Sequence, residues 1–112
     1  YRASIIPDQD DRLVALLGET YGAAIGLRYD DNITRNMTGY YAYNAQRYQT
    51  TISRWTPSAI IELGFLTGAA DRALLVGQQD RIAAALTLGI LRFLAANGLA
   101  RPIVRDLGQI VP

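Results

Sequence analysis

The chain of 112 residues contains no cysteine, no histidine and no lysine. Without cysteine it cannot form a disulfide, although this absence is compatible with an oxidising compartment. Without cysteine and histidine it also lacks the thiolate and imidazole ligands that hold most protein-bound zinc. All 11 basic residues are therefore arginine, which fits either a compositionally biased genome or a use of arginine for bidentate and stacked contacts.

The chain also has no excess of charge of either sign, because it contains 11 basic and 10 acidic residues and has a net charge of +1. This balance gives no indication of a nucleic-acid partner. Half of the residues are apolar and 19% are charged, as in ordinary globular domains. The length allows one domain with a modest core. Met37 is the single methionine and the chain begins with Tyr1, so we expect it to be part of a longer polypeptide whose signal peptide would lie elsewhere.

Two helices are predicted from the spacing of apolar residues. The first covers residues 9–21, and acidic residues at its start suit the positive end of the helix dipole. Because helices often begin this way, a capping role is favoured over a metal cluster for Asp8, Asp10 and Asp11. The second covers residues 78–96 and ends at Asn97-Gly98. Its apolar stripe is too short and interrupted to span a bilayer, and consists of Ile82, Leu86, Ile90, Phe93 and Leu94.

Two strands are also predicted, which makes the expected fold class α/β. Residues 1–6 should form a strand that ends at Pro7, because the residue before a proline is biased toward extended backbone. A second strand is predicted at about residues 58–64, where an apolar run with β-branched side chains follows Pro57. Such a run is typical of a strand buried on both faces of a sheet.

Glu62 interrupts this apolar run. A buried, ionised carboxylate is costly unless it is paired, hydrogen-bonded or set against a metal. Two interpretations follow and both stay open on these grounds. In the first, Glu62 plays a structural part: it pairs with an arginine, for which Arg54 is the nearest candidate, or it lies at the exposed carboxyl end of the strand. In the second, it is a catalytic acid and base at the C-terminal edge of the sheet, where α/β folds place their chemistry.

The segment Thr-Pro-Ser-Ala-Ile-Ile-Glu-Leu-Gly-Phe-Leu-Thr, residues 56–67, is followed by Asp-Arg-Ala-Leu-Leu at residues 71–75. It resembles the closing motif of the zinc-dependent N-acetylmuramoyl-L-alanine amidases of the type-3 family, which reads Pro-x-x-(Ile/Leu/Val)-(Ile/Val)-Glu-x-Gly-Phe. The resemblance is strong from Ile52 to Leu94 and looser from Tyr1 to Tyr48. It implies the C-terminal portion of a mixed-sheet, three-layer amidase-type domain.

The resemblance further implies a secreted hydrolase of the cell envelope or extracellular space that cleaves the amide between N-acetylmuramic acid and L-alanine in peptidoglycan. Glu62 would be the glutamate that does not bind the metal but takes a proton from a zinc-bound water and returns it to the leaving amine. The two histidines and one glutamate that bind zinc in the family lie earlier in the domain. If the chain is part of such an enzyme, the zinc ligands come from a missing N-terminal half, which lies in the same polypeptide or in a separate chain.

A non-catalytic alternative stays open because this chain has no zinc ligands of its own. It would then be an amidase-like structural or binding subunit of an envelope assembly. In either case residues 1–98 would form the amidase-like portion, and the apolar tail of residues 99–112 would pack on it or on a partner. We expect the chain to need that partner, since its central strand would otherwise expose an unpaired edge.

Residues 27–51 break the helical pattern and are rich in tyrosine, asparagine and arginine. A loop of this length is uncommon in a compact domain unless it binds something. The resemblance implies that this region lies beside the catalytic groove, so substrate contact is predicted for Asn36, Tyr40 and Tyr43, whose residue types suit sugars and peptides. Arg54 either forms the ion pair with Glu62 or grips an acidic stem peptide. The alternative is that the tyrosines cover the edge of the core.

Overall fold

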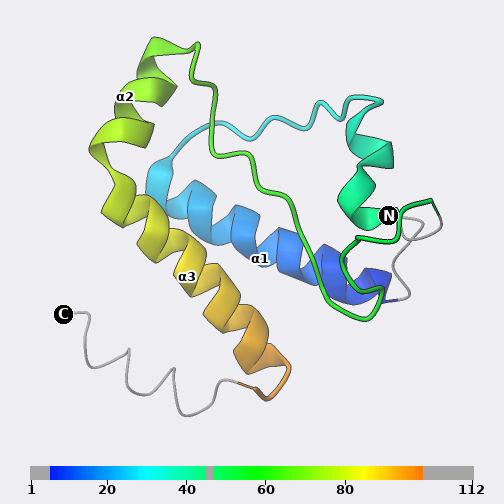
Figure 1. Cartoon of the computed structure of the whole chain (residues 1–112). Coiled ribbons are helices and arrows are strands. Elements are labelled where there is room, and N and C mark those ends of the chain that lie inside the picture. The colour runs from blue at the N-terminus through cyan, green and yellow to red at the C-terminus, as the bar shows by residue number, and fades with distance from the viewer. Residues whose placement is uncertain (1–5, 45–46, 100–112) are drawn as a thin grey trace.

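The computed structural model describes residues 6–44 and 47–99, with only the backbone described at Thr38 (Figure 1). Within these ranges no β-strand occurs. The expected α/β fold, a portion of a mixed-sheet, three-layer domain, is therefore wrong, and the described part of the chain is all-helical. Its elements are α1 (Pro7–Ile25), η1 (Met37–Gly39), η2 (Tyr41–Tyr43), α2 (Ala69–Gly77) and α3 (Gln79–Ala96), where η denotes a 3-10 helix.

Both predicted helices are present, and local backbone chemistry sets their ends. α1 extends beyond the predicted residues 9–21, because Pro7 occupies its first turn, where a missing N–H has no intrahelical partner to lose. It ends where Gly26 adopts a left-handed conformation with φ of 73° and donates its N–H to the carbonyl of Gly22. α3 matches the predicted residues 78–96 except that it begins at Gln79.

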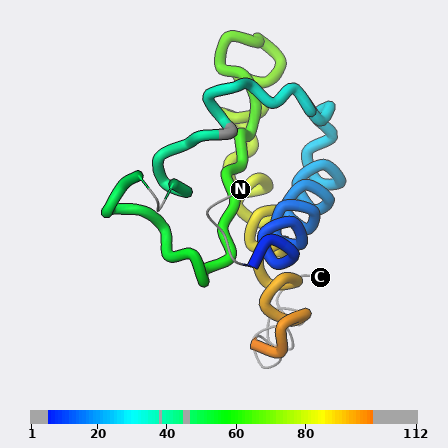
Figure 2. The backbone as a smooth tube through the Cα atoms, turned by 90° about the vertical axis from the view of Figure 1, so that its right-hand side faces the viewer, coloured from blue at the N-terminus to red at the C-terminus, as the bar shows by residue number. Residues whose placement is uncertain are grey.

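The predicted strand at residues 58–64 is instead an extended segment without a neighbouring strand. Residues 57–65 run beside α1 in both views (Figures 1 and 2). A strand needs backbone hydrogen bonds to another strand, and the described part of the chain offers this segment only helices. Of the other predicted strand, residues 1–5 lie outside the described residues, and Ile6 directly precedes α1.

α1 and α3 pack against each other at the centre of the structure (Figure 1). They approach closely at Gly89, where a Cβ atom would lie 2.7 Å from Thr20 Oγ1 and 3.2 Å from Leu17 Cα. A side chain of any size would collide at these distances, so this packing depends on glycine. Thr20 is buried at the contact and satisfies its hydroxyl by donating to the carbonyl of Leu16, at 2.9 Å.

The buried face of α3 is rotated relative to the predicted stripe. Ile82 and Phe93 are buried as predicted, but Ala85 and Gly89 complete the face, whereas Ile90 is 46% exposed. Small residues contribute little to a hydrophobic pattern, although they are the ones that let two helices approach. None of the helices among the described residues is long and apolar enough to cross a membrane.

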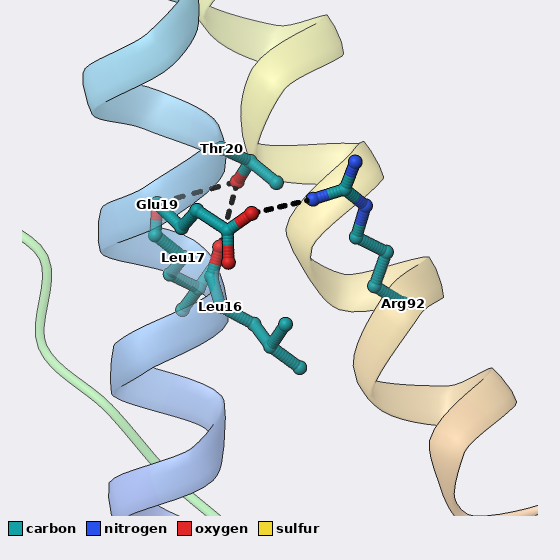
Figure 3. Close-up of polar contacts among 5 residues, drawn as sticks. All are labelled: Leu16, Leu17, Glu19, Thr20 and Arg92. Carbon is teal, nitrogen blue, oxygen red and sulfur yellow. Dashed lines mark hydrogen bonds and ion pairs between the residues drawn. The ribbon is translucent and has the colours of Figure 1, made fainter.

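One ion pair joins the exposed sides of α1 and α3 within the described residues (Figure 3). Arg92 Nη1 lies 3.1 Å from Glu19 Oε1, and the two side chains are 48% and 66% exposed. Exposed pairs of this kind contribute about 0–1 kcal/mol. The close packing at Gly89 therefore matters more to the helix pair than this ion pair does.

The core connects the extended segment to the helices. Its buried centre is formed by Tyr21, Ile25 and Ile82. Ile61 and Leu63 of the extended segment pack against this centre, so the segment is held on the helix pair by apolar contact rather than by a sheet. Partly buried side chains from α1, α2, α3 and the loop after α1 complete the cluster: Ala24, Leu27, Leu74, Leu75 and Leu86.

Candidate functional site

Glu62 lies on the side of the extended segment that faces away from the core. Ile61 and Leu63 pack inward, and successive side chains of an extended backbone point to opposite sides. Glu62 is accordingly exposed, and Ile60 and Phe65 beside it are 51% and 57% exposed. Burial of this carboxylate in a two-sided sheet is therefore wrong, because no described element covers the second side of the segment, whereas exposure of Glu62 was one of the open interpretations.

Two side chains of α1 fix the extended segment on either side of Glu62. Asp10 is 1% exposed, and its Oδ1 accepts a hydrogen bond from the N–H of Ser58 at 2.9 Å. The hydroxyl of Tyr21 donates a hydrogen bond to the carbonyl of Leu63. These bonds satisfy two backbone groups that a neighbouring strand would otherwise satisfy. They also limit how far the backbone at Glu62 can move.

The first turn of α2 fixes the end of the segment. Asp71 Oδ2 accepts a hydrogen bond from the N–H of Phe65 at 2.9 Å, and Arg72 Nη1 donates to the carbonyl of Leu66 at 2.8 Å. Gly64 has a φ of 149°, and a Cβ atom there would lie 3.2 Å from Asp71 Oδ2. Glycine is therefore required between Glu62 and the turn, because other residues rarely adopt this conformation.

The hydroxyl of Tyr21 stays protonated under neutral conditions. Burial raises its pKa above the usual value, and the nearby negative charge of Asp71 raises the pKa further. Only the protonated hydroxyl can donate to the carbonyl of Leu63, since a carbonyl has no hydrogen to give. The hydrogen bond that fixes the segment beside Glu62 therefore persists across the neutral pH range.

Glu62 itself forms no hydrogen bond or ion pair with any other residue that the structure describes. The ion pair with Arg54, one of the two interpretations of this glutamate, is therefore not formed within the described ranges. A shallow hollow at the junction of α2 and α3 is lined in part by Gln78 and Arg81, and Glu62 does not line it. The carboxylate is accessible to a ligand or a partner from the side away from α1 and α3.

The predicted substrate-binding residues lie on the chain between α1 and the extended segment. Asn36 is exposed directly before η1, and Arg54 is exposed in the turn before the extended segment. Tyr40 and Tyr43 come together, with ring centroids 6.3 Å apart. No hydrogen bond or ion pair joins any of these residues to Glu62, so the structure does not unite them with the glutamate in one contact network.

Zinc, the cofactor implied by the amidase resemblance, does not fit the donor set of this chain. The sequence contains no histidine and no cysteine. Among the described residues, no group of three or more acidic side chains lies close enough to hold a metal ion. Asp10, the buried member of the N-terminal aspartates, is directed to the N–H of Ser58. A metal beside Glu62 would have to be held by another polypeptide segment.

The chain matches none of the protein-family models, curated proteins or solved structures with which it was compared. No family is shown. The resemblance of residues 56–75 to the amidase motif therefore stays a prediction. Function has to be inferred from that motif and from the geometry around Glu62.

Sequence reasoning did not identify the side chains that fix the segment around Glu62. Asp10 lies seven residues before Leu17 and eleven before Tyr21, which places it on the same side of a helix as these buried residues. That spacing indicates a buried position and was the available signal. The two contacts of α2 are local, because each reaches back six residues across the turn before the helix, and an acidic residue in the first helical turn after Thr67-Gly68 was the available signal for one of them. The residues that form them are Asp71 and Arg72.

Proposed function

We propose that this chain contributes the acid and base glutamate of an N-acetylmuramoyl-L-alanine amidase, a peptidoglycan hydrolase of the cell envelope. The observation that carries the proposal is the setting of Glu62 within the amidase-like motif. Its side chain is exposed and unpaired among the described residues, yet side chains from α1 and α2 fix the backbone on both sides of it. A solvated surface glutamate needs no such support, whereas a reacting group has to be held in place.

Glu62 has the chemistry that amide hydrolysis requires. As a carboxylate it accepts a proton from the attacking water, and as a carboxylic acid it donates this proton to the amine that leaves when the C–N bond breaks. Fixing the backbone beside it reduces the freedom that the reaction would otherwise have to remove. The group that polarises the substrate carbonyl must come from the polypeptide segment that completes the site.

The uncovered side of the extended segment offers a place for that completing segment. The backbone N–H and C=O groups of residues 59–62 form no hydrogen bond within the described structure. Ile60 on the same stretch is about half exposed, at 51%. Extended backbone with free donors and acceptors can pair with another polypeptide. The metal-bearing half, in the same or a separate chain, would therefore pack against this side.

The test compares Glu62→Gln with Glu19→Gln in the natural-length protein that contains this sequence. Glu62→Gln should keep the helical content and lower turnover about 100-fold or more, because an amide cannot accept the proton. Glu19→Gln removes another exposed carboxylate, from the surface pair with Arg92, and should leave turnover unchanged. Turnover is measured as the release from sacculi of stem peptides with a free L-alanine amino terminus. Undiminished release by the Glu62→Gln protein would refute the proposal.

A non-catalytic binding subunit is the second candidate, and the absence of histidine and cysteine from the whole chain favours it. Under this alternative the natural-length protein binds peptidoglycan but holds no zinc and releases no stem peptide. Elemental analysis of the purified protein separates the two candidates. Bound zinc together with peptide release supports the hydrolase, and metal-free, inactive protein that still binds sacculi supports the subunit.

A further inference from the structure

Asn97 and Gly98 form the one Asn-Gly pair of the chain, directly after the last residue of α3. Both residues are exposed. In such a pair the backbone nitrogen of the glycine can attack the side-chain amide carbon of the asparagine, because glycine has no Cβ atom to hinder the approach. The other asparagines are followed by larger residues, at Asn32, Asn36 and Asn44. The Asn-Gly pair is therefore the position at which asparagine deamidation is chemically easiest.

A Schellman motif caps α3 at this pair. The N–H of Gly98 donates to the carbonyl of Ala95 at 3.0 Å, and the N–H of Leu99 donates to the carbonyl of Leu94 at 2.9 Å. Gly98 has a φ of 76°, the left-handed conformation that the motif requires of its glycine. The nitrogen that would attack Asn97 is thus engaged as a hydrogen-bond donor.

The side chain of Asn97 is held away from the Gly98 nitrogen. Its Nδ2 donates to the carbonyl of Phe93 at 2.9 Å. The backbone ψ of Asn97 is 9°, so the Gly98 nitrogen nearly eclipses the Asn97 nitrogen. Ring closure requires the Gly98 nitrogen to eclipse Cβ of Asn97 instead, because Cβ and Cγ become members of a five-membered ring. The folded cap therefore excludes the reactive conformation, and the ring can close only after the last turn of α3 has opened.

We propose that Asn97 is a deamidation site whose reaction is controlled by the opening of the last turn of α3. In the open turn a solvent base takes the Gly98 amide proton, and the nitrogen forms a bond to Cγ of Asn97. The Cγ–Nδ2 bond breaks, and Nδ2 takes up a proton from water and leaves as ammonia. Water then opens the resulting succinimide and gives aspartate or isoaspartate at position 97, with no change in oxidation state.

The reaction removes the cap that restrained it. An aspartate at position 97 has no Nδ2 to donate to the carbonyl of Phe93, and it places a negative charge at the negative end of the helix dipole. An isoaspartate also adds a methylene group to the backbone, which displaces the N–H groups of Gly98 and Leu99 from their acceptors. Deamidation therefore makes the opening of this helix end permanent.

The test follows deamidation of the full-length protein in mildly alkaline buffer. Trypsin cleaves after arginine, so Asn97 falls in a peptide of residues 93–101 and Asn32 in one of residues 29–35. Mass spectrometry of these peptides measures the conversion of each asparagine. The folded protein should convert Asn97 about tenfold or more slowly than a synthetic peptide of residues 93–101, because only the open fraction reacts. Asn32, which is exposed but precedes isoleucine, should convert more slowly than Asn97 of the synthetic peptide.

Two replacements of Leu99 separate the cap from the local sequence. Leu99→Pro removes the N–H that donates to the carbonyl of Leu94, whereas Leu99→Ala keeps it. The side chain of Leu99 is 72% exposed, so neither change removes a buried side chain. Leu99→Pro should deamidate about fivefold faster than the unaltered protein, and Leu99→Ala should stay within about twofold of it.

Each rate is divided by that of a synthetic peptide with the same replacement, which removes any effect of residue 99 on the reaction itself. A Leu99→Pro protein of normal helical content that deamidates as slowly as the unaltered protein would overturn the proposal. Equal conversion of the folded protein and its peptide, or no conversion of Asn97 in the peptide, would overturn it too. If Leu99→Pro lowers the helical content, hydrogen exchange of the unaltered protein decides. Exchange of the Gly98 N–H should be slower than in the peptide, and equally fast exchange would contradict a closed cap.

Asn97→Asp reproduces one product of the reaction. It should lower the melting temperature by about 2–5 °C, because the cap loses a donor and the helix end gains a negative charge. Asn36→Asp, on the exposed loop before η1, is the matched control and should stay within about 1 °C of the unaltered protein. An unchanged melting temperature in Asn97→Asp would show that the product still caps α3, and the proposed permanence of the opening would fail.

Discussion

Gly89 sets the distance between α1 and α3, and its replacement gives the sharpest prediction for a single residue. In Gly89→Ala the new Cβ atom would lie 2.7 Å from Thr20 Oγ1 and 3.1 Å from Leu17 Cδ2. The helices must shift to admit it, so the free energy of unfolding should fall by about 1–3 kcal/mol. Urea unfolding followed by circular dichroism measures this change.

Gly18→Ala is the matched control within α1. A Cβ atom at Gly18 would meet nothing within 4 Å, so this change should raise the free energy of unfolding by about 0.5–1 kcal/mol through the helix preference of alanine. The two glycines therefore should respond with opposite signs. If both alanine variants were stabilised, the described packing of α1 on α3 would be wrong.

At the scale of elements, α1 holds the extended segment through Tyr21, and this contact predicts a dependence of stability on pH. Burial, and then the charge of Asp71, raise the pKa of Tyr21 above the value of an exposed tyrosine. The unfolded chain therefore loses this proton first, at about pH 10. Above that pH the unfolded state binds fewer protons than the folded state, so stability falls as pH rises toward the folded pKa.

Tyr21→Phe should remove this part of the alkaline loss of stability while lowering stability near neutral pH, because the carbonyl of Leu63 loses its donor. Tyr29→Phe, which changes an exposed ring, should retain the pH dependence of the unaltered chain. Thermal unfolding followed between pH 8 and 11 compares the three proteins. If the melting temperatures of all three proteins fell equally between pH 8 and 11, the Tyr21 hydroxyl would not form the buried hydrogen bond to the carbonyl of Leu63.

The contrast between helices and the extended segment shows what local sequence can determine. The ends of α1 and α3 follow from residues within them or next to them, such as Pro7, Gly26 and Asn97. The bounds of α3 were predicted to within one residue, whereas α1 begins two residues before and ends four residues after the predicted 9–21. The strand expected at residues 58–64 required neighbours, and an apolar run does not say whether they exist. The run favours extended backbone, which is present, but the described part of the chain provides no second strand.

The candidate site was predictable to a similar extent. Glu62 is conspicuous in the sequence because it interrupts an apolar run, but this pattern did not decide between a buried and an exposed carboxylate. Exposure depends on whether a second layer covers the segment, and that is a property of the whole fold. The contacts at Ser58 and Phe65 join positions far apart in the chain or on different elements. Periodicity within one element does not report such contacts.

For the whole molecule, the uncovered side of the extended segment has a consequence for association. The backbone groups of residues 59–62 form no hydrogen bond with another described residue. Ile60, Phe65 and Leu66 are each more than half exposed, at 51%, 57% and 67%. Extended apolar backbone with free donors and acceptors is a template for pairing with another chain. Without the partner proposed above, copies of this chain should pair through the same surface.

Ile60→Lys tests this expectation, because a charge on an exposed edge opposes such pairing. The unaltered chain should show a sedimentation coefficient that rises with concentration, and Ile60→Lys should remove that rise without loss of helical content. Val76→Lys is the matched control, since Val76 is 68% exposed but lies on the helix α2 rather than on extended backbone. It should associate as the unaltered chain does. A monomeric unaltered chain at every concentration would show that the uncovered segment does not by itself recruit another polypeptide, and the docking of a metal-bearing half on this side would lose its support.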